Sequence, residues 1–363
     1  MTFEEARAAF PVLERYAYLN AGSAGPMARS TYDAVVEASQ AELGPRGGIA
    51  AFEAIMGARD RLRTALAGQI GVDAEWVALT TSTSEGCRIV VDGLGLVEGD
   101  EIVTTDAEHF GMLGPLHASG ARVRVAPVRD RPADEALDAI LAEVGPRTRL
   151  IAVSHVLWVN GHVIPLDELR AATDVPILVD GAQSVGAIPV KAEPYDFYTV
   201  SGQKWLCGPT PTGGLYVRDP EALRVGGPSY FSQASYEPDG AFEPRPGAAR
   251  FERNWMPVAF IAGLEAALAT QPEWRFERAR EMAERCREAL LAEGFDVATE
   301  PGHGTLVALR WPGDTAAAVK RLFEDDVVIR DLPKTGLLRA SCGYWTNEDD
   351  VSRLVSGLRR LAR

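Results

Sequence analysis

Cysteine is scarce in this sequence of 363 residues, and the four cysteines lie far apart. No two of them form a C-x-x-C pair, so we expect neither a disulfide framework nor a zinc site. The five histidines show no H-E-x-x-H pattern, and we therefore expect no metal. The cysteines are Cys87, Cys207, Cys286 and Cys342.

Long apolar runs are missing as well, since no stretch approaches the roughly 20 residues that a membrane helix needs. The N-terminal segment MTFEEARAAF is acidic and amphipathic, and it lacks the apolar run of a signal peptide. The net charge of −14 argues against nucleic acid as a partner, because binding phosphates requires clustered cations. We therefore expect a cytoplasmic protein that binds neither a membrane nor nucleic acid.

Lysine is also scarce: of 37 basic residues only four are lysine, namely Lys191, Lys204, Lys320 and Lys334. Any chemistry that needs a primary amine has few candidates, and three of the four lie in segments typical of a protein surface. Lys204 differs because it follows the apolar run FYTVS. An amine at the C-terminal end of a sheet strand points into the crevice where α/β proteins bind ligands. The alternative is a lysine whose stem packs while its ammonium group stays in water.

Short β-branched runs alternate with helical patterns between residues 76 and 217. This alternation predicts an α/β fold with a mostly parallel sheet that is covered on both faces. A chain of 363 residues exceeds one ordinary core, so we expect two domains. The predicted division is a large α/β domain over residues 15–250 and a small α+β domain made of residues 1–14 and 251–363. Residues 226–250, rich in Gly, Pro and aromatics, predict a functional loop.

A carboxylate, Asp180, ends the strand-like run ILVD. It is either the N-cap of a following helix or a functional acid, because a buried carboxylate is costly unless it is paired. Together with Lys204 it suggests the cofactor pyridoxal 5'-phosphate (PLP). The aldehyde of PLP forms a Schiff base with a lysine, and a carboxylate keeps its ring nitrogen protonated.

A phosphate site is available in the segment TTSTSEGC, which follows a predicted strand and opens a predicted helix. The N-terminus of a helix offers free N–H groups to an anion, and Thr83 and Ser84 add hydroxyl groups. The same segment also fits a capping box from Ser82 to Glu85. A glycine fingerprint for dinucleotides is missing, which argues against an NAD-dependent oxidoreductase.

The order of the motifs TSEG, EHF, VDGAQ, SGQKWLCGP, FER and LRAS resembles the class V aminotransferase-fold enzymes. This PLP-dependent family of fold type I includes cysteine desulfurases, selenocysteine lyases, cystine C–S lyases and isopenicillin N epimerase-like proteins. The resemblance extends from Tyr18 to the last predicted helix, and the pair VDGAQ and SGQKW is its most specific part. It implies a homodimeric enzyme that acts at the α-carbon of a small amino acid substrate.

The resemblance also implies roles for single residues. Lys204 forms the Schiff base and moves protons, Asp180 pairs with the ring nitrogen, and His109 stacks on the ring. Arg339 binds the α-carboxylate of the substrate, unless it forms a surface ion pair as most arginines do. The implied cofactor-binding residues are Thr83, Ser84, His109, Asp180, Gln183, Ser201, Gln203 and Lys204. The implied substrate-binding residues are Ala21, Gly22, Asn160 and Arg339.

Three positions depart from the family pattern. Gln203 stands where many relatives have histidine, and Trp158 stands where they often have asparagine, with Asn160 nearby. Trp255 stands where a threonine of many relatives contacts the phosphate of the partner subunit.

The loop before Arg339, residues 323–336, has no cysteine, which argues against a persulfide-forming desulfurase. We therefore favour β-elimination, as in C–S lyases. Transamination and epimerisation at the α-carbon stay open as alternatives, as does a catalytically degenerate binding protein of the same fold.

Overall fold

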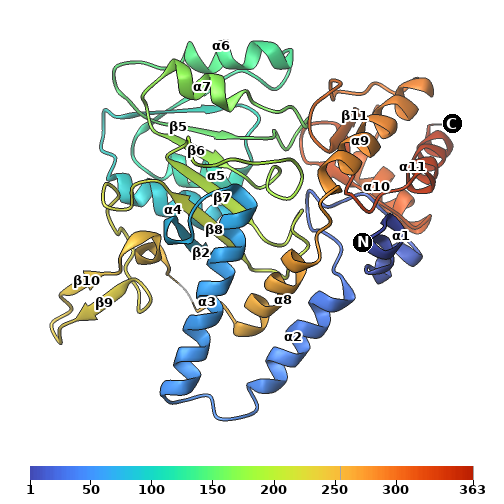
Figure 1. Cartoon of the computed structure of the whole chain (residues 1–363). Coiled ribbons are helices and arrows are strands. Elements are labelled where there is room, and N and C mark those ends of the chain that lie inside the picture. The colour runs from blue at the N-terminus through green and yellow to red at the C-terminus, as the bar shows by residue number, and fades with distance from the viewer. Residues whose placement is uncertain (254, 363) are drawn as a thin grey trace.

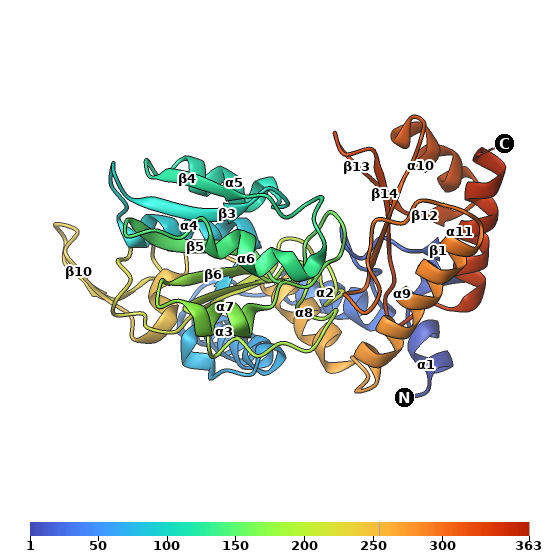
Figure 2. The same cartoon turned by 90° about the horizontal axis from the view of Figure 1, so that it is seen from above.

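The computed structural model of the chain describes residues 1–253 and 255–362. Its largest element is a seven-stranded sheet with the order β2-β8-β7-β6-β5-β3-β4 (Figures 1 and 2). The strands from β7 to β4 pair in parallel, whereas β8 runs antiparallel to both β7 and β2. The predicted α/β fold with a mostly parallel sheet is therefore confirmed. The strands are β2 (Val77–Thr80), β3 (Glu101–Thr105), β4 (Arg122–Ala126), β5 (Thr148–Ser154), β6 (Ile177–Asp180), β7 (Phe197–Ser201) and β8 (Gly213–Val217).

Helices cover both faces of this sheet. In β6, Val179 belongs to a core shared with α3, α6 and α7, whereas its neighbour Leu178 belongs to a core shared with α4 and α5. Successive residues of a strand point to opposite faces, so burial on both faces explains the unbroken apolar runs. These helices are α3 (Ile49–Ile70), α4 (Thr83–Leu94), α5 (Phe110–His117), α6 (Ala136–Leu141) and α7 (Leu166–Ala172).

A second sheet of three strands has the order β11-β14-β13. Helices α9, α10 and α11 pack around it in a separate apolar core, and β1 joins this part by pairing with β12. Figure 2 shows β13 and β14 turned toward the large sheet, with α10, α11 and both termini farther out. The elements are α1 (Phe3–Ala8), β1 (Ala17–Tyr18), α9 (Arg275–Ala292), β11 (Leu306–Arg310), α10 (Thr315–Glu324), β12 (Val327–Val328), β13 (Arg330–Leu332), β14 (Leu337–Ser341) and α11 (Glu348–Leu361). The domain boundaries given above stay a prediction.

The remaining elements connect these two parts. Two helices, α8 (Val258–Ala269) and α9, follow each other in the chain, and the break between them lies at Pro272, which disfavours a continuous helix. The predicted functional loop contains the hairpin of β9 and β10, which projects from the molecule (Figure 1). In the described part of the chain no helix has the length and apolarity to cross a membrane. These elements are α2 (Arg29–Ala41), β9 (Gln233–Tyr236), β10 (Phe242–Pro244), α8 (Val258–Ala269) and the 3-10 turns η1 (Pro11–Glu14), η2 (Ala74–Trp76), η3 (Ala133–Glu135) and η4 (Gly247–Phe251).

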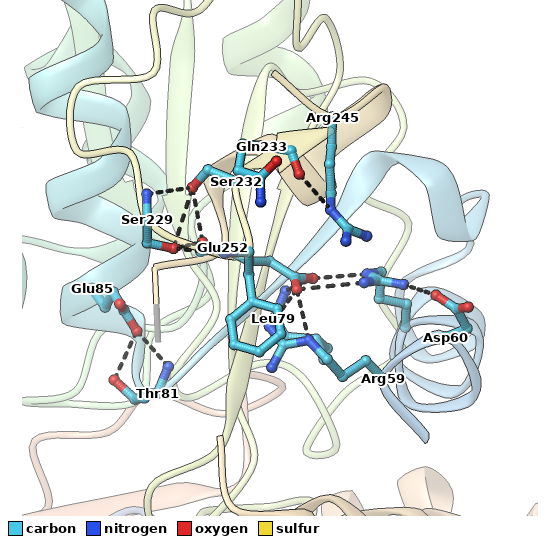
Figure 3. Close-up of polar contacts among 12 residues, drawn as sticks. Arg59, Asp60, Leu79, Thr81, Glu85, Ser229, Ser232, Gln233, Arg245 and Glu252 are labelled. Atoms are coloured by element: carbon cyan, nitrogen blue, oxygen red, sulfur yellow. Dashed lines mark hydrogen bonds and ion pairs between the residues drawn. The ribbon is translucent and has the colours of Figure 1, made fainter. Parts of the chain in front are cut away.

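A buried ion cluster around Glu252 ties the end of this loop to the large sheet (Figure 3). The Glu252 carboxylate accepts hydrogen bonds from Arg59 Nε at 3.0 Å, Arg63 Nε at 2.8 Å and the backbone N–H of Leu79 at 3.0 Å. The Arg59 guanidinium also lies over the ring of Phe231, 4.1 Å from its centroid. Arg59 and Glu252 are only 1% exposed, so each charge is stabilised by its bonded partners in place of water.

We expect Glu252→Gln to lower the free energy of unfolding by about 3–5 kcal/mol, because it removes the negative charge that the buried Arg59 and Arg63 share. The matched control is Glu265→Gln, which breaks a pair with the largely exposed Arg61 and should cost about 0–1 kcal/mol. Denaturant unfolding followed by circular dichroism measures both values. Equal losses for the two variants would contradict this role of the cluster.

Candidate active site

The parallel pairing of β6 with β7 brings Asp180 and Lys204 to the same edge of the large sheet. Asp180 is the last residue of β6, and Lys204 follows the last residue of β7 by three positions. No helix lies between β6 and β7, so the interpretation of Asp180 as a helix N-cap is wrong. Its Oδ1 instead accepts hydrogen bonds from the backbone N–H of Ala182 at 2.9 Å and from Thr199 Oγ1 at 3.2 Å. These contacts hold a buried carboxylate in a fixed position beside the lysine.

The residue Lys204 is half-buried at this edge of the sheet. The pKa of Lys204 is lowered from 10.5 to about 8, mainly by desolvation of the amine. The charge of Asp180 opposes this shift, and the charges of Arg339 and Arg330 contribute to it. At neutral pH such an amine is far more often unprotonated than an exposed lysine is. It can therefore act as a nucleophile and as a proton carrier.

Arg339 lies fully buried on β14 with most of its hydrogen-bonding capacity unused. Its Nη1 donates to the backbone carbonyl of Trp158 at 2.7 Å, whereas Nε and Nη2 have no partner among the described residues. Burial lowers the pKa of Arg339 to about 9, and the charge of Arg330 adds to this shift. The interpretation as a surface ion pair is therefore wrong.

Backbone atoms of the N-terminal segment border this guanidinium. A Cβ atom at Gly22 would lie 2.6 Å from Arg339 Nη2 and 2.9 Å from Ser341 Oγ, and that buried hydroxyl also has no partner in the described part of the chain. A glycine is therefore needed here for the close approach. Unsatisfied buried donors of this kind fit a carboxylate that the protein itself does not provide.

The N-terminus of α4 is a candidate anion site. Ser82 caps the helix by accepting a hydrogen bond from the backbone N–H of Glu85 at 3.2 Å. The Glu85 carboxylate contacts the backbone N–H of Thr81 at 2.6 Å and its hydroxyl at 2.7 Å. The capping box is thus only half formed. Thr83 and Ser84 occupy the first turn, where backbone N–H groups lack partners within the helix.

His109 forms the N-cap of α5, where its Nδ1 accepts a hydrogen bond from the backbone N–H of Gly111 at 3.1 Å. Its ring meets the ring of Trp158 edge-on, with centroids 5.2 Å apart. Partial burial lowers the pKa of His109, and the charge of Lys204 adds to this effect. The imidazole is therefore neutral over more of the pH range than an ordinary histidine.

Two glutamines lie beside the lysine. Gln183 Nε2 donates to the backbone carbonyl of Gly22 at 2.9 Å, and its Oε1 accepts a hydrogen bond from Trp205 Nε1 at 2.9 Å. Ser201 Oγ donates to Gln203 Oε1 at 3.0 Å. These bonds fix the orientation of both amides. One N–H of the Gln183 amide is left over for a further acceptor.

Asn160 lies apart from the other predicted site residues. Its Nδ2 donates to the backbone carbonyl of Arg129 at 3.3 Å, and its Oδ1 accepts from the backbone N–H of His162 at 3.1 Å. Its side chain borders a separate cavity of about 330 Å³, whose lining contains none of the other predicted site residues. In this loop the residue that reaches the site is Trp158.

Sequence reasoning missed two ionisable residues near the site. Arg330 on β13 influences the charge states of Lys204, His109 and Arg339. Glu108, which precedes His109 in the chain, is buried, and burial raises its pKa to about 7 despite hydrogen bonds from Ser154 and Thr105. The only sequence signal for Glu108 is its place in the motif EHF, and Arg330 offers none beyond its closeness to Arg339.

The four cysteines give the site no accessible thiol. All four are free and buried. Cys207 comes nearest to the predicted lysine in the chain, but burial raises the pKa of its thiol well above the ordinary value. A buried thiol of this kind is a poor nucleophile.

Comparison with known proteins reveals clear relatives. Residues 23–298 match the family described as Aminotransferase class-V. The chain is 32% identical to the isopenicillin N epimerase of Amycolatopsis lactamdurans, over 95% of each protein. It is 29% identical to a cysteine desulfurase of Enterobacter sp. (strain 638), over 99% of this chain and 98% of that protein.

Solved structures of the cystine C–S lyase C-DES are similar over nearly their whole length. The complex of C-DES with its reaction product cysteine persulfide has a TM-score of 0.89 and 29% identity, and it covers 96% of this chain and 98% of that one. A mutant of the same enzyme, with glycine covalently linked to PLP, has a TM-score of 0.89 and 28% identity over 97% of this chain and 98% of that one.

We expect acetylation of Lys204 by acetic anhydride to rise with pH and to reach its midpoint near pH 8, because only the neutral amine reacts. The exposed Lys320 is the internal control for the reagent, because its side chain is open to water. Peptide mass spectrometry of the cofactor-free protein measures both curves. Asp180→Asn should move the midpoint of Lys204 to lower pH, since the carboxylate raises this pKa. A midpoint of Lys204 at its ordinary pKa of 10.5 would refute the perturbed amine.

Proposed function

The chain belongs to the aminotransferase class-V family, whose cofactor is PLP, and we propose that it catalyses β-elimination on an amino acid. In this proposal it is a C–S lyase that releases a sulfur-containing group from the β-carbon. The observation that carries the proposal is the lack of an accessible thiol at the site, since all four cysteines are buried. The likeness to the C–S lyase C-DES supports the same reaction.

The chemistry of the donor set fits PLP. Asp180 offers a carboxylate to the ring nitrogen, Lys204 an amine to the aldehyde, and the first turn of α4 offers N–H and hydroxyl groups to the phosphate. The leftover N–H of Gln183 offers a donor to the ring hydroxyl. When bound, PLP supplies an electrophilic aldehyde and a ring that accepts an electron pair from the α-carbon. We therefore assign the cofactor to these residues.

The substrate carboxylate fits the unsatisfied donors of Arg339. Nε and Nη2 lie on one edge of the guanidinium, so they can bind both oxygens of a carboxylate at once. The close approach of Gly22 and the bond from Nη1 to Trp158 restrict the orientation of this group. A substrate held in this way has its α-carbon presented toward the crevice that contains Lys204.

Lys204 is the proton carrier of the reaction. Its pKa of about 8 lets the neutral Nζ take the α-proton and, once protonated, give a proton to the departing sulfur. His109, with its lowered pKa, would lie against the bound cofactor without adding a positive charge beside the ammonium group. The balance of this elimination is simple: the Cα–H and Cβ–S bonds break, the sulfur leaves as a thiol, and water completes the release of pyruvate and ammonia.

Epimerisation is the second candidate, because the relative with 32% identity is named an epimerase. Transamination and a degenerate binding protein stay open as further alternatives. The alternative of a catalytically degenerate binding protein is disfavoured by two buried charges, those of Arg339 and Asp180. Among the described residues neither has a group of opposite charge within ion-pair distance, and unpaired buried charges are typical of functional sites.

We expect the PLP-loaded enzyme to convert L-cystine and S-substituted L-cysteines into pyruvate and ammonia, both measured by coupled assay and mass spectrometry. Lys204→Ala should abolish this activity, and Arg339→Met should lower kcat/KM by at least about 30-fold through loss of a charged hydrogen-bonded contact. Inverted stereochemistry at the α-carbon without pyruvate would establish epimerisation instead. Accumulation of pyridoxamine phosphate would establish transamination.

We also propose that the protein is a homodimer. Apolar side chains are exposed at the turn between α2 and α3, where Leu43 is 90% and Ile49 is 80% exposed. Trp255 and Tyr230 stack nearby and are 58% and 54% exposed. Phe52 at the start of α3 contacts Tyr230, so the turn and the loop form one face.

Sedimentation equilibrium should therefore give the mass of a dimer for the wild type. The double variant Leu43→Glu/Ile49→Glu should sediment as a monomer, because it places charges on the apolar face. Val97→Glu, at a residue that is 62% exposed elsewhere, is the control and should stay dimeric. A monomeric wild type would contradict the proposed dimer.

A further inference from the structure

Two histidine rings stack where a loop of the large sheet meets a loop of the small sheet. The first loop, residues 156–163, follows β5, and the second, residues 299–304, precedes β11. The ring of His162 on the first loop and the ring of His303 on the second have centroids 4.9 Å apart and planes inclined by 32°. His162 is buried and His303 is half-buried, so the rings form part of the contact between the two loops.

Each ring accepts a hydrogen bond from the backbone of the opposite loop. The N–H of Val163 donates to His303 Nδ1 at 3.0 Å, and the N–H of Glu300 donates to His162 Nε2 at 3.4 Å. A ring nitrogen can accept a hydrogen bond only while it carries no proton. Protonation of either nitrogen would set one N–H against another. The two rings with their two bonds, here called the histidine clasp, therefore require neutral imidazoles.

Two further bonds join the loops without a titratable group. Thr299 Oγ1 donates to the carbonyl of Asn160 at 2.6 Å, and the N–H of Gly304 donates to the carbonyl of Gly161 at 3.2 Å. The approach is close, since a Cβ atom at Gly161 would lie 2.5 Å from the carbonyl oxygen of Leu306. These bonds provide a comparison for the clasp, because pH does not change them.

The first loop also carries Trp158 into the candidate active site. The carbonyl of Trp158 accepts the hydrogen bond from Arg339 Nη1 at 2.7 Å, and its indole ring meets the ring of His109 edge-on. Within the loop, the N–H of Leu157 donates to the carbonyl of His162 at 2.9 Å. A displacement of His162 therefore reaches the carbonyl group that orients Arg339.

Burial lowers the pKa of both histidines from the ordinary value of 6.5. The charge of His303 contributes to the lowered pKa of His162, because two cationic rings at this separation repel each other. The charge of Glu300 opposes the shift in both rings, and a backbone hydrogen bond with Ala298 opposes it in His162. The net direction favours the neutral rings that the clasp requires.

Other charged side chains beside the rings pair largely with one another. Arg310 lies 3.5 Å from a carboxylate oxygen of Asp296, and Arg287 lies 2.5 Å from one of Glu284. The charged residues that line the cavity beside His162 are Arg129, Asp130, Arg131, Asp296, Glu300, Arg310 and Lys334. Those that line a smaller cavity of about 130 Å³ beside His303 are Arg280, Glu284, Arg287 and Glu300.

We propose that His162 and His303 are positioning residues, whose neutral rings hold the loop of Trp158 where its carbonyl group orients Arg339 for the substrate carboxylate. The proposal rests on the part of the proposed function that assigns this carboxylate to Arg339, and not on elimination. Because both pKa values are lowered in the folded protein, the clasp is complete above pH 6.5 and is lost as the pH falls through the lowered values. Acid therefore loosens the loop and weakens carboxylate binding.

Hydrogen exchange of residues 156–163, measured by mass spectrometry and corrected for the intrinsic rate at each pH, tests the clasp. In the wild type we expect the corrected exchange to quicken about 10-fold between pH 7.5 and pH 5, the effect of losing one or two hydrogen bonds. In His162→Gln/His303→Asn the amide oxygens can accept the same bonds without titrating, so exchange should stay slow at both pH values. The control Thr299→Val removes a cross-loop bond, so it should quicken exchange at every pH and keep the pH dependence of the wild type. Corrected exchange in the wild type that does not change with pH would overturn the proposal, whatever the variants do.

The affinity for glycine tests the connection to Arg339. Glycine has one carboxylate and no leaving group, and the absorbance of the PLP-loaded protein reports its binding without turnover. We expect the dissociation constant of the wild type to equal that of His162→Gln/His303→Asn at pH 7.5 and to exceed it about 10-fold at pH 5. Equal constants at pH 5, in a wild type whose loop exchanges faster, would overturn the positioning role. If no cysteine derivative yields pyruvate, elimination fails, but both of these measurements still decide the role of the clasp.

Discussion

The parallel pairing of β6 and β7 is the constraint on which the candidate site depends. Strands that run side by side in the same direction end at the same edge, so Asp180 and Lys204 lie at one edge of the sheet, where α/β proteins bind ligands. Their opposite charges stabilise each other there, since Asp180 is the group that opposes a still lower pKa of the amine. The small sheet completes the site from the other side with the guanidinium groups on β13 and β14.

The sequence predicts the large sheet well because burial leaves a simple pattern. Strands covered on both faces are unbroken apolar runs, and polar residues that end such runs, as Asp180 does, lie at the sheet edge by geometry alone. The antiparallel direction of β8 leaves no such pattern, because strand direction depends on the connection and not on the strand itself. Arg330 was missed for a similar reason. Its place at the site follows from pairing with Arg339, and one arginine among 33 carries no mark of that pairing.

The distribution of charge distinguishes structural from functional ions in this protein. Arg59 and Arg63 share the Glu252 carboxylate, so they hold the loop before α8 without needing a ligand. Arg339 is equally buried, yet two of its nitrogens have no partner among the described residues. A buried cation without an anion destabilises the folded chain, and such a cost is typical of binding sites. The site is therefore cationic within an acidic protein, which suits anionic substrates.

The central claim is that the amine of Lys204 holds the cofactor. The most direct measurement is reduction of the PLP-loaded protein with borohydride, followed by digestion and peptide mass spectrometry. The account predicts a pyridoxyl group on Lys204 in nearly every molecule, and on none of Lys191, Lys320 and Lys334. A pyridoxyl group on another lysine, or on none, would contradict the account.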